Sequence, residues 1–134
     1  MTIIIAIKPE YVEQIFNGNK KYEYRKIVAK RGKVDKAIIY ETSPAKRIVG
    51  CITIDEIIQT TPQDLWEGTN DYAGITEDSF FEYFNNRQVA YAYKIKDIVR
   101  FDEPKLLSDY EIGYAIRNFV YFDGHERSES VGSL

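Results

Sequence analysis

Histidine, cysteine, methionine and tryptophan each occur only once among the 134 residues. A single cysteine, Cys51, excludes an internal disulfide and a zinc site built from thiolates. Because it lies in the apolar run RIVGCITI, we expect it to be a buried free thiol. The single histidine, His125, lies in a polar tail, which argues strongly against histidine catalysis and a histidine-rich metal site. We therefore expect neither a metal nor a cofactor.

Long apolar runs are also missing. No stretch approaches the roughly 20 apolar residues that a membrane-spanning helix requires, and the first residues lack the pattern of a signal peptide. We therefore expect a cytoplasmic protein with no membrane partner. A chain of 134 residues that is 44% hydrophobic suffices for one compact domain. We expect this domain to span residues 1–124 and to be followed by a polar tail at 125–134.

Acidic and basic residues are unevenly distributed along the chain. Residues 8–47 contain 11 Lys and Arg against 5 Asp and Glu, a balance of +6, whereas residues 48–134 contain 7 against 16, a balance of −9. The basic segment suits a phosphate-bearing ligand, and it equally suits an ordinary solvated surface. The acidic total of −3 argues against tight, nonspecific DNA binding.

Short apolar runs separated by turn signals predict more strand than helix. Strands are expected at 2–8, 21–27, 35–43, 46–58, 89–101 and 118–122. Helical segments are expected at 9–16, where Asn17-Gly18 supplies the stop, at 62–68, at 76–86 with Thr76 as N-cap, and at 107–116 with Ser108 as cap. Gly50, inside a strand, predicts a bulge or a close backbone approach. Because the helices interrupt the strands irregularly, we expect an α+β fold with a curved, mixed sheet.

The strand KYEYRKI alternates charge with tyrosine. Lys21, Glu23 and Arg25 share one face, whereas Tyr22 and Tyr24 share the other. The tyrosines are suited to the core, so the charged face is expected to look toward water or a groove. Taken alone, Glu23 and Arg25 are also explained by a simple ion pair across two positions of a strand.

A family resemblance favours a ligand site at this strand over a simple ion pair. Gly18, Lys20, Glu23 and Arg25 follow a short helix with the spacing G-x-K-x-x-E-x-R, which resembles the signature of ASCH domains. Further segments, from IYETSPAKRIVGCITIDEI to AYAYKIKDIVRFDEP, follow in the order found in small ASCH proteins, so the resemblance covers about residues 3–122. It implies a PUA-like mixed β pseudo-barrel with short flanking helices. It also implies an RNA or nucleotide-like ligand, bound in a cleft beside the signature strand.

On this resemblance we predict a ligand site formed by Lys20, Glu23 and Arg25. The two cations suit a phosphate or a base carbonyl, and the glutamate suits the exocyclic amine of a base. The sequence adds four further candidates for ligand contact, namely Lys8, Tyr40, Ser43 and Lys46.

Two other functions stay open. Some small members of the family hydrolyse acylated cytidine, and their pattern has the signature lysine, a threonine where Glu23 stands, and a later glutamate. Lys20 matches this pattern, Glu23 departs from it, and Asp71 is a loose counterpart of the later acid. If the protein is a small amidohydrolase, Lys20 and Glu23 are the candidate catalytic residues, with Glu23 activating a water. The third possibility is a protein-interaction module of a regulator. The oligomeric state is left open.

Overall fold

The structure is a computed structural model that describes residues 1–124; the polar tail and His125 lie outside the described residues. Six strands, three α-helices and two 3-10 helices follow one another along these residues. In chain order they are β1 (Thr2–Ile7), α1 (Pro9–Phe16), β2 (Tyr22–Arg25), β3 (Lys36–Glu41), β4 (Arg47–Thr60), α2 (Pro62–Thr69), η1 (Asn70–Tyr72), α3 (Glu77–Tyr83), β5 (Ala90–Lys105), η2 (Leu107–Tyr110) and β6 (Phe119–Phe122).

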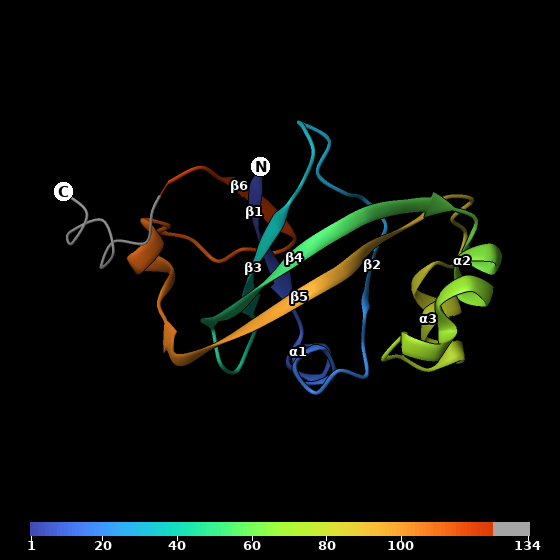
Figure 1. The fold of residues 1–134 in the computed structure, drawn as a ribbon, viewed down its shortest axis with the longest axis horizontal. Helices are drawn as coiled ribbons and strands as arrows, with labels where there is room; N and C mark the ends of the chain where they lie inside the picture. Colours follow the sequence, from blue (N-terminus) through green and yellow to red (C-terminus); the bar gives the residue numbers. More distant parts are fainter. Residues whose placement is uncertain (125–134) are drawn as a thin grey trace.

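All six strands belong to one mixed, curled sheet with the order β2-β5-β4-β3-β1-β6. Only β1 and β3 run parallel, and every other neighbouring pair is antiparallel. The long β4 and β5 cross the molecule, α1 lies beside the sheet, and α2 and α3 lie together at one end of β4 and β5 (Figure 1). The expected α+β architecture, a curved sheet with short flanking helices, is confirmed.

Local signals explain the turn that leads into β2. Pro9 occupies the first turn of α1, where its missing N–H costs nothing, and Val12 and Ile15 bury the apolar face of the helix. The helix ends at Asn17, and Gly18 then adopts a φ of 86°. This left-handed geometry favours glycine, as the Asn17-Gly18 pair predicts.

The helices between β4 and β5 begin at threonine caps. Thr61 Oγ1 accepts a hydrogen bond from Asp64 N at the start of α2, and Thr76 Oγ1 accepts one from Ser79 N at the start of α3. The predicted cap at Thr76 is confirmed, and α2 extends one residue beyond the helical segment predicted at 62–68. Phe80 of α3 is fully buried.

The prediction of a short helix capped by Ser108 is wrong in its details. A 3-10 helix begins after Leu106, whose N–H donates to Asp109 Oδ2 at 2.9 Å, so Ser108 lies inside the helix. Glu111 then adopts a φ of 62° and ends it. The side chain of Asp109 rather than that of Ser108 therefore fixes where this helix starts.

Both faces of β1 are buried, and this divides the core. Ile3, Ile5 and Ile7 face the cluster under α1, whereas Ile4 and Ala6 face a second cluster on the opposite side. A third cluster joins the end of the long strands to the helices; its buried members are Tyr24, Leu65, Ala73, Phe80, Phe84, Ala90 and Ala92. Within residues 1–124 no helix is long and apolar enough to cross a membrane.

Gly50 and Cys51 lie in the part of β4 that pairs with both β3 and β5. The pairing of β4 with β5 shifts register between Ile48 and Gly50, and a Cβ on Gly50 would lie 2.3 Å from the carbonyl oxygen of Val99. The bulge and the close backbone approach predicted at Gly50 are both present. Cys51 is a buried free thiol, as expected, and burial raises its pKa.

Candidate functional site

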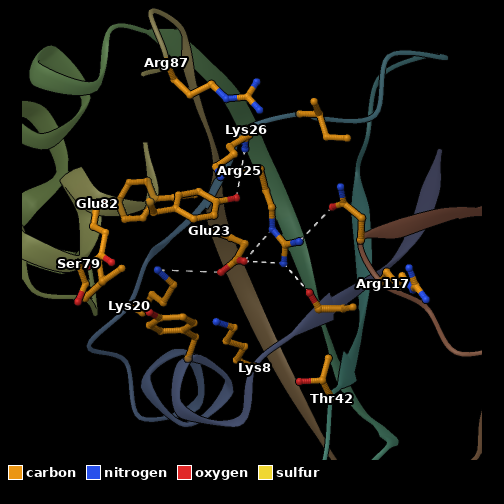
Figure 2. Close-up of a pocket in the computed structure, with 17 residues that line it drawn as sticks. Lys8, Lys20, Glu23, Arg25, Lys26, Thr42, Ser79, Glu82, Arg87 and Arg117 are labelled. Atoms are coloured by element: carbon orange, nitrogen blue, oxygen red, sulfur yellow. Dashed lines mark hydrogen bonds and ion pairs between the residues drawn. The ribbon is translucent and has the colours of Figure 1, made fainter. Parts of the chain in front are cut away.

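A cleft of about 820 Å³ lies beside β2, between the end of β1, the first turn of α1, the helix α3 and the segment before β6 (Figure 2). Its lining residues are Ala6, Lys8, Tyr11, Lys20, Glu23, Tyr24, Arg25, Lys26, Ile27, Thr42, Ile75, Ser79, Glu82, Tyr83, Arg87, Arg117 and Asn118. They come from distant parts of the chain, so the cleft exists only in the folded domain.

Glu23 lies at the centre of this cleft, and only 5% of it is exposed. Its Oε2 accepts two hydrogen bonds from Arg25, from Nε at 2.9 Å and from Nη2 at 2.7 Å. Its Oε1 lies 4.0 Å from Lys20 Nζ and has no hydrogen-bond partner among the described residues. A buried carboxylate oxygen without a hydrogen-bond partner is costly, so Oε1 is an acceptor whose hydrogen-bonding capacity is unused.

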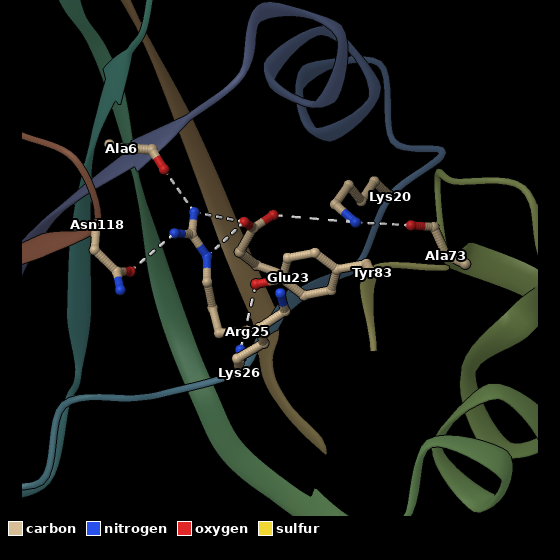
Figure 3. Close-up of polar contacts among 8 residues, drawn as sticks. All are labelled: Ala6, Lys20, Glu23, Arg25, Lys26, Ala73, Tyr83 and Asn118. Carbon is tan, nitrogen blue, oxygen red and sulfur yellow. Dashed lines mark hydrogen bonds and ion pairs between the residues drawn. The ribbon is translucent and has the colours of Figure 1, made fainter. Parts of the chain in front are cut away.

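Arg25 holds Glu23 in this position. Its guanidinium also donates to the carbonyl oxygen of Ala6 at 2.6 Å and to Asn118 Oδ1 at 3.2 Å (Figure 3). These contacts tie β2 to the end of β1 and to the segment before β6. The fork of donors therefore fixes the carboxylate in one orientation and leaves Oε1 as its free oxygen.

Lys20 is almost entirely buried, with 2% exposed. Its Nζ donates to the carbonyl oxygen of Ala73 at 2.8 Å and lies over the ring of Tyr24, 4.6 Å from the centroid. Burial lowers the pKa of Lys20 from its ordinary 10.5 to about 8, against the opposing effect of Glu23. Gly74 makes room for it, since a Cβ there would lie 2.4 Å from the Lys20 Cβ.

Two tyrosines form a wall of the cleft toward α3. The Tyr24 hydroxyl is hydrogen-bonded to Thr69 Oγ1 at 2.7 Å, and burial raises the pKa of Tyr24 to about 12. The Tyr83 hydroxyl accepts a hydrogen bond from Lys26 N at 3.3 Å, and burial raises the pKa of Tyr83 as well. Both hydroxyls therefore stay protonated at neutral pH and serve as neutral polar groups.

The rim carries more positive charge than negative. Six cationic and two acidic side chains line the cleft, which gives a formal balance of +4 in a chain whose net charge is −3. Among residues 1–124, no carboxylate forms a salt bridge with Lys8, Lys26, Arg87 or Arg117. Positive charges attract anionic ligands, and the low-dielectric walls of a cleft strengthen this attraction.

The structure brings together four of the seven predicted site residues: Lys8, Lys20, Glu23 and Arg25 all line the cleft. The other three, Tyr40, Ser43 and Lys46, are not among the lining residues. Tyr40 is buried in the cluster on the other side of β1, and Ser43 and Lys46 are exposed in the turn between β3 and β4. Thr42, the first residue of that turn, lines the cleft instead.

Sequence reasoning missed the cleft residues that come from later segments. Arg87 follows α3, Arg117 precedes β6, and Glu82 lies on α3. Asp71, the loose counterpart of a later acid, lies in η1 and does not line the cleft; Glu82 is the later acid that does. No local sequence signal distinguishes these three residues from ordinary surface charges.

Comparison with known proteins assigns the family. The model of the ASCH domain matches residues 5–100, a range that contains β2 and most of the cleft. The chain belongs to the ASCH domain family. The matched range includes Lys20, Glu23 and Arg25 and ends before Arg117.

Similar curated proteins are only distantly related to this ASCH domain. An ASCH domain-containing ribonuclease from Zymomonas mobilis is 27% identical over 94 residues, which covers 70% of this chain and 64% of that protein. Two proteins from Ureaplasma parvum match 90% of this chain: ATP synthase subunit alpha, 26% identical over 15% of its length, and large ribosomal subunit protein uL22, 23% identical over 39% of its length. In each case the match spans less than two thirds of the relative.

Solved structures confirm the fold of this ASCH domain. The crystal structure of ASCH from Zymomonas mobilis superposes with a TM-score of 0.84 at 22% identity, covering 99% of this chain and 94% of that one. A mutant of the same protein gives a TM-score of 0.84 at 21% identity, covering 99% and 97%. The PUA-like α+β fold implied by the resemblance is therefore present.

Proposed function

We propose that this ASCH domain binds RNA or a nucleotide-like ligand in the cleft beside β2. The observation that carries the proposal is the free Oε1 of Glu23, a buried acceptor held in place by Arg25 in a cleft with a positive balance. A nucleotide combines a donor-bearing base with an anionic phosphate, so it complements both features at once.

From this geometry we infer separate roles for the groups of the cleft. Glu23 Oε1 accepts a hydrogen bond from the exocyclic amine of a base, which also satisfies the unpartnered oxygen. Lys20 Nζ, 4.0 Å away, supplies a donor for the neighbouring acceptor of the same base. Lys8, Arg87 and Arg117 supply positive charge for phosphate.

The comparisons support the same class of ligand. One relative is named a ribonuclease and another a ribosomal protein. These names describe those proteins, and at 27% and 23% identity they support an RNA-related ligand for this chain without assigning one.

Equilibrium titration with a panel of ribonucleoside monophosphates tests the proposal. Nucleotides of cytosine and adenine, which pair an amine with a neighbouring acceptor, should bind more tightly than uridine monophosphate by about five- to 150-fold, the equivalent of about 1–3 kcal/mol. Uracil has no exocyclic amine, and in the pose that cytosine takes its O4 would face Glu23 in place of the amine. Equal affinities would show that Glu23 does not recognise the base. If neither a nucleotide nor RNA binds, the proposed binding function is wrong.

Hydrolysis of a nucleic-acid component is the second candidate, and the Lys20–Glu23 pair favours it. A buried lysine with a pKa of about 8 and a carboxylate with a free oxygen are 4.0 Å apart in the cleft. Such a pair suits activation of a water or hydroxyl by Glu23 and stabilisation of the resulting negative charge by Lys20. Incubation with acylated cytidine and with single-stranded RNA, each in large excess over the protein, tests this. Substrates that stay intact would exclude hydrolysis.

A further inference from the structure

The segment from Lys26 to Lys33, here called the basic loop, leaves the cleft and crosses to β3. It contains four cations and no acidic residue: Lys26, Lys30, Arg31 and Lys33. Three of these cations, all but Lys26, are exposed. The basic loop therefore presents positive charge to solvent next to the cleft.

The backbone of the basic loop is fixed although it has no regular secondary structure. Val28 and Ala29 are buried in the core cluster under α1, and Ala29 N donates to the Tyr93 hydroxyl at 3.0 Å. Lys30 N and Arg31 N both donate to the Tyr121 hydroxyl, at 2.9 and 3.0 Å. Because the fold itself makes these contacts, the basic loop presents its cations on a backbone that is held in place.

Tyrosine rings also hold the cationic side chains. The distances from cation to ring centroid are 4.8 Å for Lys26 over Tyr83, 5.7 Å for Lys30 over Tyr91 and 4.0 Å for Arg31 over Tyr121. Among residues 1–124 no carboxylate forms a salt bridge with any cation of the basic loop. The side chains are thus positioned, while their charge is left without an acidic partner.

The basic loop is continuous with the cleft. Lys26 and Ile27 line the cleft, and Lys26 lies near Arg87 at the same end of it (Figure 2). Tyr91, under Lys30, is paired with Arg25 in the sheet, and Tyr121, under Arg31, is in the strand that follows Arg117. A chain leaving the cleft at this end would meet the cations of the basic loop.

We propose that the basic loop binds the phosphates of a single-stranded RNA whose base occupies the cleft, so that the ligand is an RNA segment of several nucleotides rather than a free nucleotide. This inference rests on the proposed function. Single-stranded RNA fits because Glu23 Oε1 is buried, and the amine of a paired base is already engaged by its partner. A positive track next to a base-binding site is the arrangement by which proteins follow a single strand.

The test compares Arg31→Gln with a matched control, Arg100→Gln. Arg100 also stacks on an aromatic ring, that of Phe16 at 5.2 Å, but it lies beside a different groove with Glu10 and Glu13. Each protein is titrated with an oligoadenylate of about eight nucleotides, a length typical of one single-strand binding domain, and with adenosine monophosphate. The oligoadenylate titrations are repeated over a range of salt concentrations.

Arg31→Gln should weaken oligoadenylate binding about fivefold at about 0.1 M salt and reduce the slope of log affinity against log salt by about 0.7. Adenosine monophosphate should bind Arg31→Gln and the parent protein equally, and Arg100→Gln should resemble the parent with both ligands. Unchanged oligoadenylate binding, or an equal loss in Arg100→Gln, would overturn the inference. So would an equal loss of adenosine monophosphate binding, since the loop would then not be a separate subsite.

The two proposals fail in different ways. If adenosine monophosphate binds the cleft and the oligoadenylate binds no more tightly, the basic loop has no role while the proposed function stands. If Arg31→Gln weakens the oligoadenylate but Glu23→Gln does not, the loop holds RNA and base recognition by Glu23 is wrong. If neither ligand binds, both proposals are wrong.

Discussion

Substitution of Glu23 by glutamine tests the centre of the cleft with almost no change of shape. Arg25 donates two hydrogen bonds to Oε2, at 2.9 and 2.7 Å, so the amide oxygen of glutamine must take that place. The amide NH₂ then occupies the position of Oε1 and presents donors where the parent protein presents an acceptor. The substitution therefore inverts the hydrogen-bonding pattern seen by a base.

The expected loss for an amine-bearing base is about 1–3 kcal/mol, or roughly five- to 150-fold in affinity, because its amine would face a donor. Uridine monophosphate, which offers carbonyl oxygens, should lose much less and become the relatively preferred nucleotide. Calorimetric titration of cytidine and uridine monophosphates against both proteins measures this. A variant that prefers uridine monophosphate to cytidine monophosphate would have a new specificity, which simple damage to the fold would not produce.

Three other results would refute the reasoning. Unchanged affinities and preference would mean that Glu23 only forms an ion pair. Normal binding with a loss of turnover of about a hundredfold or more would instead assign Glu23 to catalysis. Equal weakening of both nucleotides would indicate a general loss of the site, which urea denaturation would reveal as a fall of more than about 3 kcal/mol in the free energy of unfolding.

The remaining predictions concern charge, pH and backbone. Binding of short RNA should weaken as salt rises with a shallow slope, since few phosphates meet a cation; salt-independent binding would contradict this. Affinity for adenosine monophosphate should fall as pH rises through about 8, where Lys20 loses its proton, and Lys20→Met should abolish that fall. The difference in free energy of unfolding between the parent protein and Lys20→Met should instead rise between pH 8 and 10.5, because there Lys20 binds more protons in the unfolded chain than in the folded one. The raised pKa values of Cys51, Tyr24 and Tyr83 act in the opposite direction and cancel in this difference, so a flat difference would argue against the lowered pKa of Lys20. Gly74→Ala should destabilise by about 1–3 kcal/mol in urea denaturation and weaken nucleotide binding, because φ is +63° and the new Cβ meets Lys20. Its control, Gly68→Ala in α2, has open space around it and should stabilise by about 0.5–1 kcal/mol; equal effects of the two would show that Gly74 does not shape the site.

Local chemistry made much of the fold predictable. Pro9, Asn17-Gly18 and Thr76 each act within a few residues of their own position, and the structure has the predicted start, stop and cap at those places. The helix at Leu107–Tyr110 was harder to predict, because its N-cap is Leu106, an apolar residue whose backbone N–H is bonded by Asp109 from inside the helix.

The candidate site was predictable only where it lies on one strand. Glu23 and Arg25 alternate with tyrosines, so one pattern identifies both. Arg87 reaches the cleft because the chain returns to it after α3, and Arg117 because the chain returns to it before β6. No local sequence pattern encodes either return. Tyr40 lies in a strand paired on both sides and covered on both faces, so alternation could not tell whether it faced the cleft or the core.

The pairing of β1 with β6 has a consequence for how this fold combines with other proteins. Thr2 is in register with Phe122, so the first strand begins beside the point where the last strand ends. A domain whose ends meet can be inserted into a loop of a host protein, or joined end to end with another copy, without stretching either partner. The cleft residues at the far end of β1, such as Lys8, lie about 20 Å along the strand from that junction, by the usual rise per residue. The fold is therefore portable, because its first and last strands lie side by side at one edge of the sheet.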